Sequence, residues 1–267
     1  MDRRQFIRQG ALAMLWGLFG FPGAVGSLAR AATPDGRTTG RPRIALIIDD
    51  IGFSRARAQA FLDIGVTMTY AVLPRLTYSR ELAAEISGQG LQVMLHQPME
   101  PFNRSIDPGP GAVYVKDDPD RIAATVRENL ALLPWAAGVN NHMGSRFTSS
   151  SEKMSQVLPV IRDHGLFFVD SVTSGRSKAF QTAQSLHMPA GCRNVFLDDC
   201  VDEDRTLCRL NQLLRHARSH GQAVGIGHPH SETARALARF ARSRARNDVD
   251  FVSVSEILDL PGPPALH

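Results

Sequence analysis

The chain has 267 residues, of which 43% are hydrophobic, 21% charged and 7% aromatic. This composition is typical of a globular protein and excludes disordered and fibrous classes. Residues 1–32 hold four of the 30 basic residues and one of the 26 acidic ones, which leaves 26 basic against 25 acidic residues in the remainder. The net charge of the remainder is thus close to zero. Because nucleic-acid-binding proteins usually carry an excess of basic residues, we expect no nucleic-acid partner.

Residues 1–31 have the pattern of a secretory signal peptide. Arg3 and Arg4 precede an apolar stretch broken by glycine and proline, and Ala29 and Ala31 form a small-residue cleavage site. The paired arginines resemble the twin-arginine export signal. No later segment has the roughly 18 consecutive apolar residues of a transmembrane helix. We therefore expect a soluble periplasmic protein with no stable membrane span after cleavage; an uncleaved N-terminal anchor is the alternative.

The mature chain alternates short apolar runs with amphipathic segments. A polar linker at 32–42 precedes the predicted domain at 43–260, and a tail follows at 261–267. Strands are predicted at 44–48, 68–73, 92–95, 138–140, 166–169, 195–197, 223–226 and 251–254. Helices are predicted at 54–64, 79–87, 119–133, 152–164, 178–186, 203–219 and 232–242.

Short apolar strands between helices indicate an α/β fold with a parallel sheet covered on both faces. Seven or eight such units in about 225 residues suggest a (β/α) barrel, somewhat small for a complete one, with an open doubly wound sheet as the alternative. The three cysteines, Cys192, Cys200 and Cys208, have no CxxC spacing. They predict neither a disulfide scaffold nor a zinc knuckle.

Polar residues follow the predicted strands at the edge where parallel α/β folds bind ligands. They are Asp49, Asp50, His96, Glu100, Asn140, Asn141, His142, Ser145, Arg146, Asp170, Asp198, Asp199, His228 and His230. Carboxylates at a buried edge cost desolvation unless they are paired or bind a cation, so the collection indicates a functional site. We interpret Asp198 and Asp199, which begin an acidic run, as a solvated helix start.

Imidazole and carboxylate without thiolate suit zinc or another divalent metal ion with a water in an open position. Such a site, with a carboxylate base and a histidine acid, hydrolyses amide or ester bonds. The sequence has no GxSxG elbow, no P-loop and no GxGxxG fingerprint after the first strand. A metal-dependent phosphoesterase is disfavoured because the edge offers chiefly Arg146 as a cation.

Six motifs together resemble the divergent polysaccharide deacetylase family, a branch of the NodB-like carbohydrate esterases. They are IIDDIG at 47–52, LHQPMEP at 95–101, GVNNHMGSRFT at 138–148, LFFVDS at 166–171, VFLD at 195–198 and IGHP at 226–229. The resemblance covers nearly the whole mature chain. It implies a distorted barrel of the NodB-like type and metal-dependent removal of acetyl groups from amino sugars.

The resemblance also implies roles for single residues. Asp49 corresponds to the catalytic base, Asp170 to the acid that orients the catalytic histidine, and His228 to that histidine. Asp50 and His96 correspond to metal ligands. The second histidine of the wider group's H-x-x-x-H motif falls on Glu100, so the third ligand is either Glu100 or His142 from the next strand.

We favour His142, because two histidines and one carboxylate keep the usual ligand set. Five further residues at the edge are expected to contact substrate: Glu100, Asn141, Ser145, Arg146 and His230. In the long loop at 97–118, Phe102 and Tyr114 either stack on sugar rings or pack the loop onto the barrel.

The sequence thus predicts a periplasmic, zinc-type deacetylase acting on an N-acetylated glycan, possibly related to peptidoglycan. The alternative is a glycan- or envelope-protein-binding module on the same fold, with weak or no catalysis.

Overall fold

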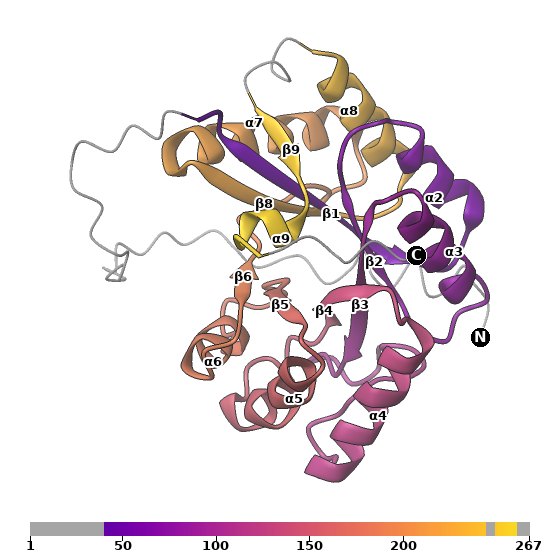
Figure 1. Cartoon of the computed structure of the whole chain (residues 1–267), viewed down its shortest axis with the longest axis vertical. Coiled ribbons are helices and arrows are strands. Elements are labelled where there is room, and N and C mark those ends of the chain that lie inside the picture. Colours follow the sequence, from indigo (N-terminus) through magenta and orange to yellow (C-terminus); the bar gives the residue numbers. More distant parts are fainter. Residues whose placement is uncertain (1–39, 244–248, 261–267) are drawn as a thin grey trace. The chain divides into compact units, whose positions relative to one another are not determined.

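The computed structural model describes residues 40–243 and 249–260 (Figure 1). The strands are β1 (Arg43–Ile51), β2 (Thr69–Val72), β3 (Gln92–Met99), β4 (Ala136–Met143), β5 (Phe167–Asp170), β6 (Ala190–Cys192), β7 (Val195–Phe196), β8 (Gln222–Gly227) and β9 (Asp250–Val252). The helices are α2 (Arg55–Leu62), α3 (Ser79–Gly88), α4 (Pro119–Leu132), α5 (Ser151–Asp163), α6 (Ala179–Ser185), α7 (Glu203–His220), α8 (Ser231–Arg242) and α9 (Val254–Ile257). The predicted signal peptide, most of the linker and the predicted tail lie outside the described residues.

The strands form one parallel sheet in the order β6-β5-β4-β3-β2-β1-β8-β7, and β9 adds to β1. Strands β6 and β7 follow one another in the chain but lie at the two ends of this order, as in a barrel left open between them. The predicted fold of parallel strands alternating with helices is confirmed. Figure 1 shows helices α2 to α8 at the periphery of the sheet.

Two differences from the predicted elements concern short segments. Strand β6 was not predicted, because its three residues carry no β-branched or large apolar side chain. The predicted strand at 251–254 ends at Val252 instead, and Ser253 caps α9. Its hydroxyl accepts from the Glu256 backbone amide while the Glu256 carboxylate accepts from the Ser253 amide, which is a capping box.

The sheet has two apolar faces, and alternate residues of each strand belong to opposite faces. On the outer face, residues such as Leu46 and Leu95 pack with helix residues such as Phe61. On the inner face, Ala45 and Met94 belong to a smaller cluster of strand residues that α9 also joins. Whether a residue is odd- or even-numbered within its strand therefore decides which face its side chain lies on. We call this its parity, and it determines which polar residues at the strand ends reach the interior of the barrel.

Local signals explain where the helices begin and end. Asp118 accepts from the Arg121 amide at the start of α4, where Pro119 needs no hydrogen-bond acceptor. Asp202 caps α7 in the same way, and Gly221, with a left-handed φ of 83°, is the C-cap that follows His220. Among the described residues, no helix is long and apolar enough to cross a membrane.

Candidate metal and catalytic site

Three side chains with ligand atoms meet at the carboxyl ends of β1, β3 and β4. Asp50 Oδ1 lies 3.2 Å from His96 Nε2 and 2.9 Å from His142 Nδ1, and the two ring nitrogens are 3.1 Å apart. Within residues 40–243 and 249–260, this is the one group of at least three His, Cys, Asp or Glu side chains placed to hold a metal ion. We call it the ligand cluster.

The spacing of the ligand cluster fits a divalent cation. Atoms about 2.0–2.1 Å from one zinc ion lie roughly 2.8–3.4 Å apart at octahedral to tetrahedral angles. The three separations fall in this range, and Asp50 Oδ1 is buried without a hydrogen-bond partner. The structure thus brings together the three predicted ligands, and Glu100 is not among them.

A buried amide joins the ligand cluster to the predicted base. Asn140 Nδ2 donates to Asp49 Oδ1 at 2.7 Å, and Asn140 Oδ1 faces His96 Nδ1 at 2.8 Å. Because the amide nitrogen is committed to Asp49, the amide oxygen accepts, and His96 Nδ1 carries the proton. The lone pair of His96 is then on Nε2, the nitrogen that belongs to the ligand cluster.

Both carboxylates of the Asp49-Asp50 pair reach the site, although neighbouring side chains of a strand point to opposite faces. Asp49 follows Ala45 and Ile47 on the inner face. Asp50 has a left-handed φ of 56°, and the register of β1 against β2 shifts between Ile48 and Ile51. This irregularity turns Asp50 inward, and strain of this kind is often found at functional sites.

The predicted catalytic histidine is held by an aspartate that sequence reasoning did not select. His228 Nδ1 lies 3.0 Å from Asp198 Oδ1, and the His228 amide donates to Asp198 Oδ2 at 2.6 Å. Thr233 Oγ1 also donates to Asp198 Oδ2. Asp198 is only 6% exposed, so its interpretation as part of a solvated helix start is wrong. Asp199 lies before the N-cap of α7 and pairs with Arg205 and Arg209, so it is not a solvated helix start either.

The contacts of Asp170 do not match its predicted role beside His228. Its carboxylate accepts from the amides of Val172 and Phe180 and from the Ser177 hydroxyl, all in the segment that follows β5. The residue before it, Val169, belongs to the inner cluster, so Asp170 has the parity of the outer face. Among the residues that the structure describes, the carboxylate that is hydrogen bonded to His228 is that of Asp198.

Two of the predicted substrate contacts form a partly buried ion pair. Glu100 Oε1 accepts from Arg146 Nη1 at 3.0 Å, and Glu100 Oε2 accepts from the Val115 amide at 2.7 Å. The Glu100 carbonyl also accepts from the Arg146 amide. These bonds connect the loop after β3 to the loop after β4. Glu100 and Arg146 therefore hold the two loops together at the carboxyl edge of the sheet.

Of the other three predicted substrate contacts, two form hydrogen bonds within the protein and the third lies beside His228. Asn141 accepts from the Ser171 amide and donates to a backbone carbonyl. The Ser145 hydroxyl accepts from the Phe102 amide at 3.0 Å. His230 precedes α8, and its ring centroid is 6.1 Å from that of His228. Among these three, His230 lies next to the predicted catalytic machinery.

The two adjacent carboxylates differ in acidity. Burial raises the pKa of Asp49 above its ordinary value. Burial acts on Asp50 in the same direction, but attraction and hydrogen bonding to the neighbouring histidines, His142 first and then His96 and His228, together outweigh it and hold the pKa of Asp50 well below its usual range. One carboxylate is thereby suited to accept a proton and the other to stay ionised, a division typical of active sites.

The imidazole of His228 is held in its protonated form. Burial lowers the pKa of His228, but attraction and hydrogen bonding to the Asp198 carboxylate, with attraction to Asp50 and Asp49, together outweigh it and raise the pKa to about 10. The same attraction holds the pKa of Asp198 below its ordinary value despite burial. His228 therefore carries a proton at neutral pH and can donate it.

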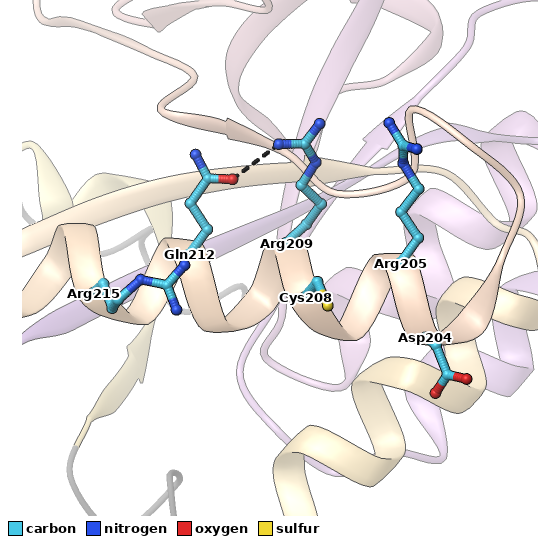
Figure 2. A pocket seen from close by; sticks show the side chains of 6 residues that line it. All are labelled: Asp204, Arg205, Cys208, Arg209, Gln212 and Arg215. Atoms are coloured by element: carbon cyan, nitrogen blue, oxygen red, sulfur yellow. Dashed lines mark hydrogen bonds between the residues drawn. The ribbon is translucent and has the colours of Figure 1, made fainter.

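A separate pocket on α7 contains none of the predicted site residues. Its lining is Asp204, Arg205, Cys208, Arg209, Gln212 and Arg215 (Figure 2). Arg205 and Arg209 both pair with Asp199, at 2.9 and 2.6 Å, and Arg209 also donates to Gln212. Their guanidinium groups stabilise the start of α7, so the pocket does not add to the catalytic site.

Comparison with known proteins agrees with the resemblance predicted from the motifs. A family model described as divergent polysaccharide deacetylase matches residues 46–258. The chain is 32% identical over 219 residues to the uncharacterized protein YibQ of Escherichia coli strain K12, which covers 82% of this chain and 68% of YibQ.

Solved structures have the same fold. The uncharacterized protein ATU2773 from Agrobacterium tumefaciens C58 is similar with a TM-score of 0.75 at 26% identity, over 81% of this chain and 89% of that one. The catalytic domain of a peptidoglycan N-acetylglucosamine deacetylase from Eubacterium rectale gives 0.53 at 16%, over 83% and 92%. BA3943, a CE4 family pseudoenzyme from Bacillus anthracis, gives 0.51 at 16%, over 82% and 66%. The last two likenesses concern the fold alone.

Proposed function

Because the chain belongs to the divergent polysaccharide deacetylase family, we propose that it is a metal-dependent hydrolase that removes N-acetyl groups from an amino-sugar glycan. The observation that carries the proposal is the ligand cluster of Asp50, His96 and His142 beside the buried carboxylate of Asp49. A binding protein with no catalysis has no need of a base placed 3.6 Å from a ligand atom.

In this proposal Asp50, His96 and His142 hold a divalent ion such as zinc. When bound, such an ion lowers the pKa of a coordinated water to about 7 and polarises a carbonyl oxygen. Asn140 fixes the tautomer of His96, so that Nε2 presents its lone pair to the ion.

The chain's own residues then move the protons of amide hydrolysis. Asp49 accepts a proton from the attacking water as the water oxygen bonds to the acetyl carbon. His228, kept protonated by Asp198, donates to the sugar nitrogen as the carbon–nitrogen bond breaks. The immediate products are acetic acid and the free amine of the sugar; the acid ionises to acetate in water, and proton exchange with solvent returns Asp49 to its carboxylate and His228 to its protonated form, so atoms and charges balance.

We further propose that the protein works in the periplasm, where peptidoglycan is a nearby N-acetylated glycan. This proposal is supported by the twin-arginine-type pattern of residues 1–31.

The test is acetate release from N-acetylglucosamine oligomers by the zinc-loaded protein, with Asp49→Asn as the inactive variant. We expect release by the wild type and a loss of at least about 100-fold in Asp49→Asn. The matched control is Asp63→Asn, an exposed aspartate at the end of α2, which should retain full activity. Binding of oligomers without acetate release would instead favour the alternative, a glycan-binding module.

A further inference from the structure

Large apolar side chains are exposed at few positions of the described chain. Phe53, Phe102, Leu132 and Val201 are 40%, 49%, 37% and 51% exposed. Three of them lie in segments that follow β1, β3 and β7, at the same edge as the ligand cluster, whereas Leu132 is the last residue of α4. Exposed apolar side chains that gather around a site indicate a ligand with an apolar face.

Phe102 is exposed but its backbone is fixed. Its amide donates to Ser145 Oγ at 3.0 Å. Two residues earlier, Glu100 accepts from Arg146 Nη1 and from the Val115 amide. Glu100 stands where the wider family motif has a metal-binding histidine, and here it anchors the loop that presents Phe102. An aromatic ring on an anchored loop loses little conformational entropy when a ligand packs on it.

Arg176, from the segment between β5 and α6, lies over the Phe102 ring, with Cζ 5.9 Å from the ring centroid. Among the described residues, no carboxylate forms an ion pair with Arg176, so its guanidinium hydrogens remain for a ligand. Thr173 Oγ1 donates to the Met143 carbonyl at 2.8 Å, which ties the segment of Arg176 to the loop after β4.

Phe102 and Arg176 lie within reach of the ligand cluster. Met143 directly follows His142, and Ser145 comes three residues after His142. Three residues of extended chain span at most about 11 Å. Phe102, whose amide bonds to Ser145, is therefore close enough for one oligosaccharide to contact both Phe102 and the ligand cluster.

We propose that Phe102 and Arg176 form a sugar-binding platform for a distal residue of an oligosaccharide whose acetyl group lies at the ligand cluster. This inference rests on the proposed function. The C–H face of a pyranose ring matches the exposed aromatic ring, and its hydroxyl groups match the unpaired donors of Arg176. The platform therefore selects for chains over single amino sugars.

The test measures the Kd of the zinc-loaded protein for the tetramer of N-acetylglucosamine and for the monosaccharide. We expect Phe102→Ala to weaken tetramer binding about fivefold, which corresponds to ~1 kcal/mol. Phe102→Trp should restore it, and Arg176→Gln should weaken it independently. Leu132→Ala removes another exposed apolar side chain, at the end of α4 and away from the site, and should leave the tetramer Kd unchanged.

Acetate release measured in parallel separates this inference from the proposed function. Release from the tetramer with an unchanged Kd in both Phe102→Ala and Arg176→Gln would overturn the platform and leave the deacetylase standing. Tetramer binding that depends on Phe102 without acetate release would support the platform and overturn the deacetylase. Absence of both binding and release would overturn both.

Discussion

The pairing of Asp198 with His228 makes a quantitative prediction for Asp198→Asn. Removing the carboxylate should return the pKa of His228 from about 10 towards its ordinary value of 6.5. A full return to 6.5 would lower the protonated fraction at pH 8 from about 99% to about 3%, and at pH 6 only to about 76%. If His228 is the proton donor, the variant loses about 30-fold in kcat at pH 8 and about 1.3-fold at pH 6.

Two assays check this prediction. An NMR titration of the His228 ring reports its pKa without any substrate, and the pH profile of acetate release reports its role in catalysis. Asp199→Asn is the matched control, because Asp199 is the next residue but pairs with Arg205 and Arg209 instead. An unshifted His228 titration, or an equal loss of kcat at every pH, would refute the assigned role of Asp198.

The same pair makes the stability of the protein depend on pH. The pKa of His228 is higher in the folded chain than its ordinary value of 6.5, so protonation stabilises the fold. This contribution is fully present below about pH 6.5 and is lost as the pH rises through about 10. The free energy of unfolding should therefore fall more steeply over this range in the wild type than in Asp198→Asn. Parallel curves would contradict the pairing.

Three further substitutions test single contacts. Asn140→Leu removes the amide between base and ligand, and the affinity for zinc in a chelator competition should fall about 10- to 100-fold; an unchanged affinity would argue against a role in the ligand shell. Glu100→Gln should destabilise the protein by about 1–3 kcal/mol in urea and keep its zinc, whereas loss of zinc would identify Glu100 as a ligand. Gly138→Ala places a Cβ 2.3 Å from the Phe167 ring and should cost about 1–3 kcal/mol, while Gly175→Ala, with nothing within 4 Å, should change stability by less than ~0.5 kcal/mol.

Most of the fold could be predicted from the sequence because short apolar runs and amphipathic segments alternate in it. The same alternation within each strand carries information about the site. His96 and Asn140 occupy neighbouring register positions of β3 and β4, and both have the parity of the inner face. Asp198 is two residues after Phe196, on the parity opposite to the outward-facing Leu197, and this signal could have identified it.

The rest depends on backbone geometry that residue types do not show. Strand alternation predicts an outward Asp50, and only its left-handed φ of 56° brings it to the ligand cluster. The ligand set favours His142 over Glu100 as the third ligand already from the sequence, but only the structure shows that the His142 ring lies beside Asp50 and His96. The S-x-x-E pattern at Ser253–Glu256, by contrast, is visible in the sequence, and this signal could have corrected the predicted strand at 251–254 to a helix start.

The central claim is that Asp50, His96 and His142 hold a metal ion, and elemental analysis of the purified protein tests it most directly. After dialysis against zinc, we expect about one ion per wild-type chain and its loss in both His96→Ala and His142→Ala. His164→Ala, which alters an exposed histidine at the end of α5, should keep the ion. A wild-type chain that holds no zinc, or a His142→Ala variant that still binds it fully, would contradict the account.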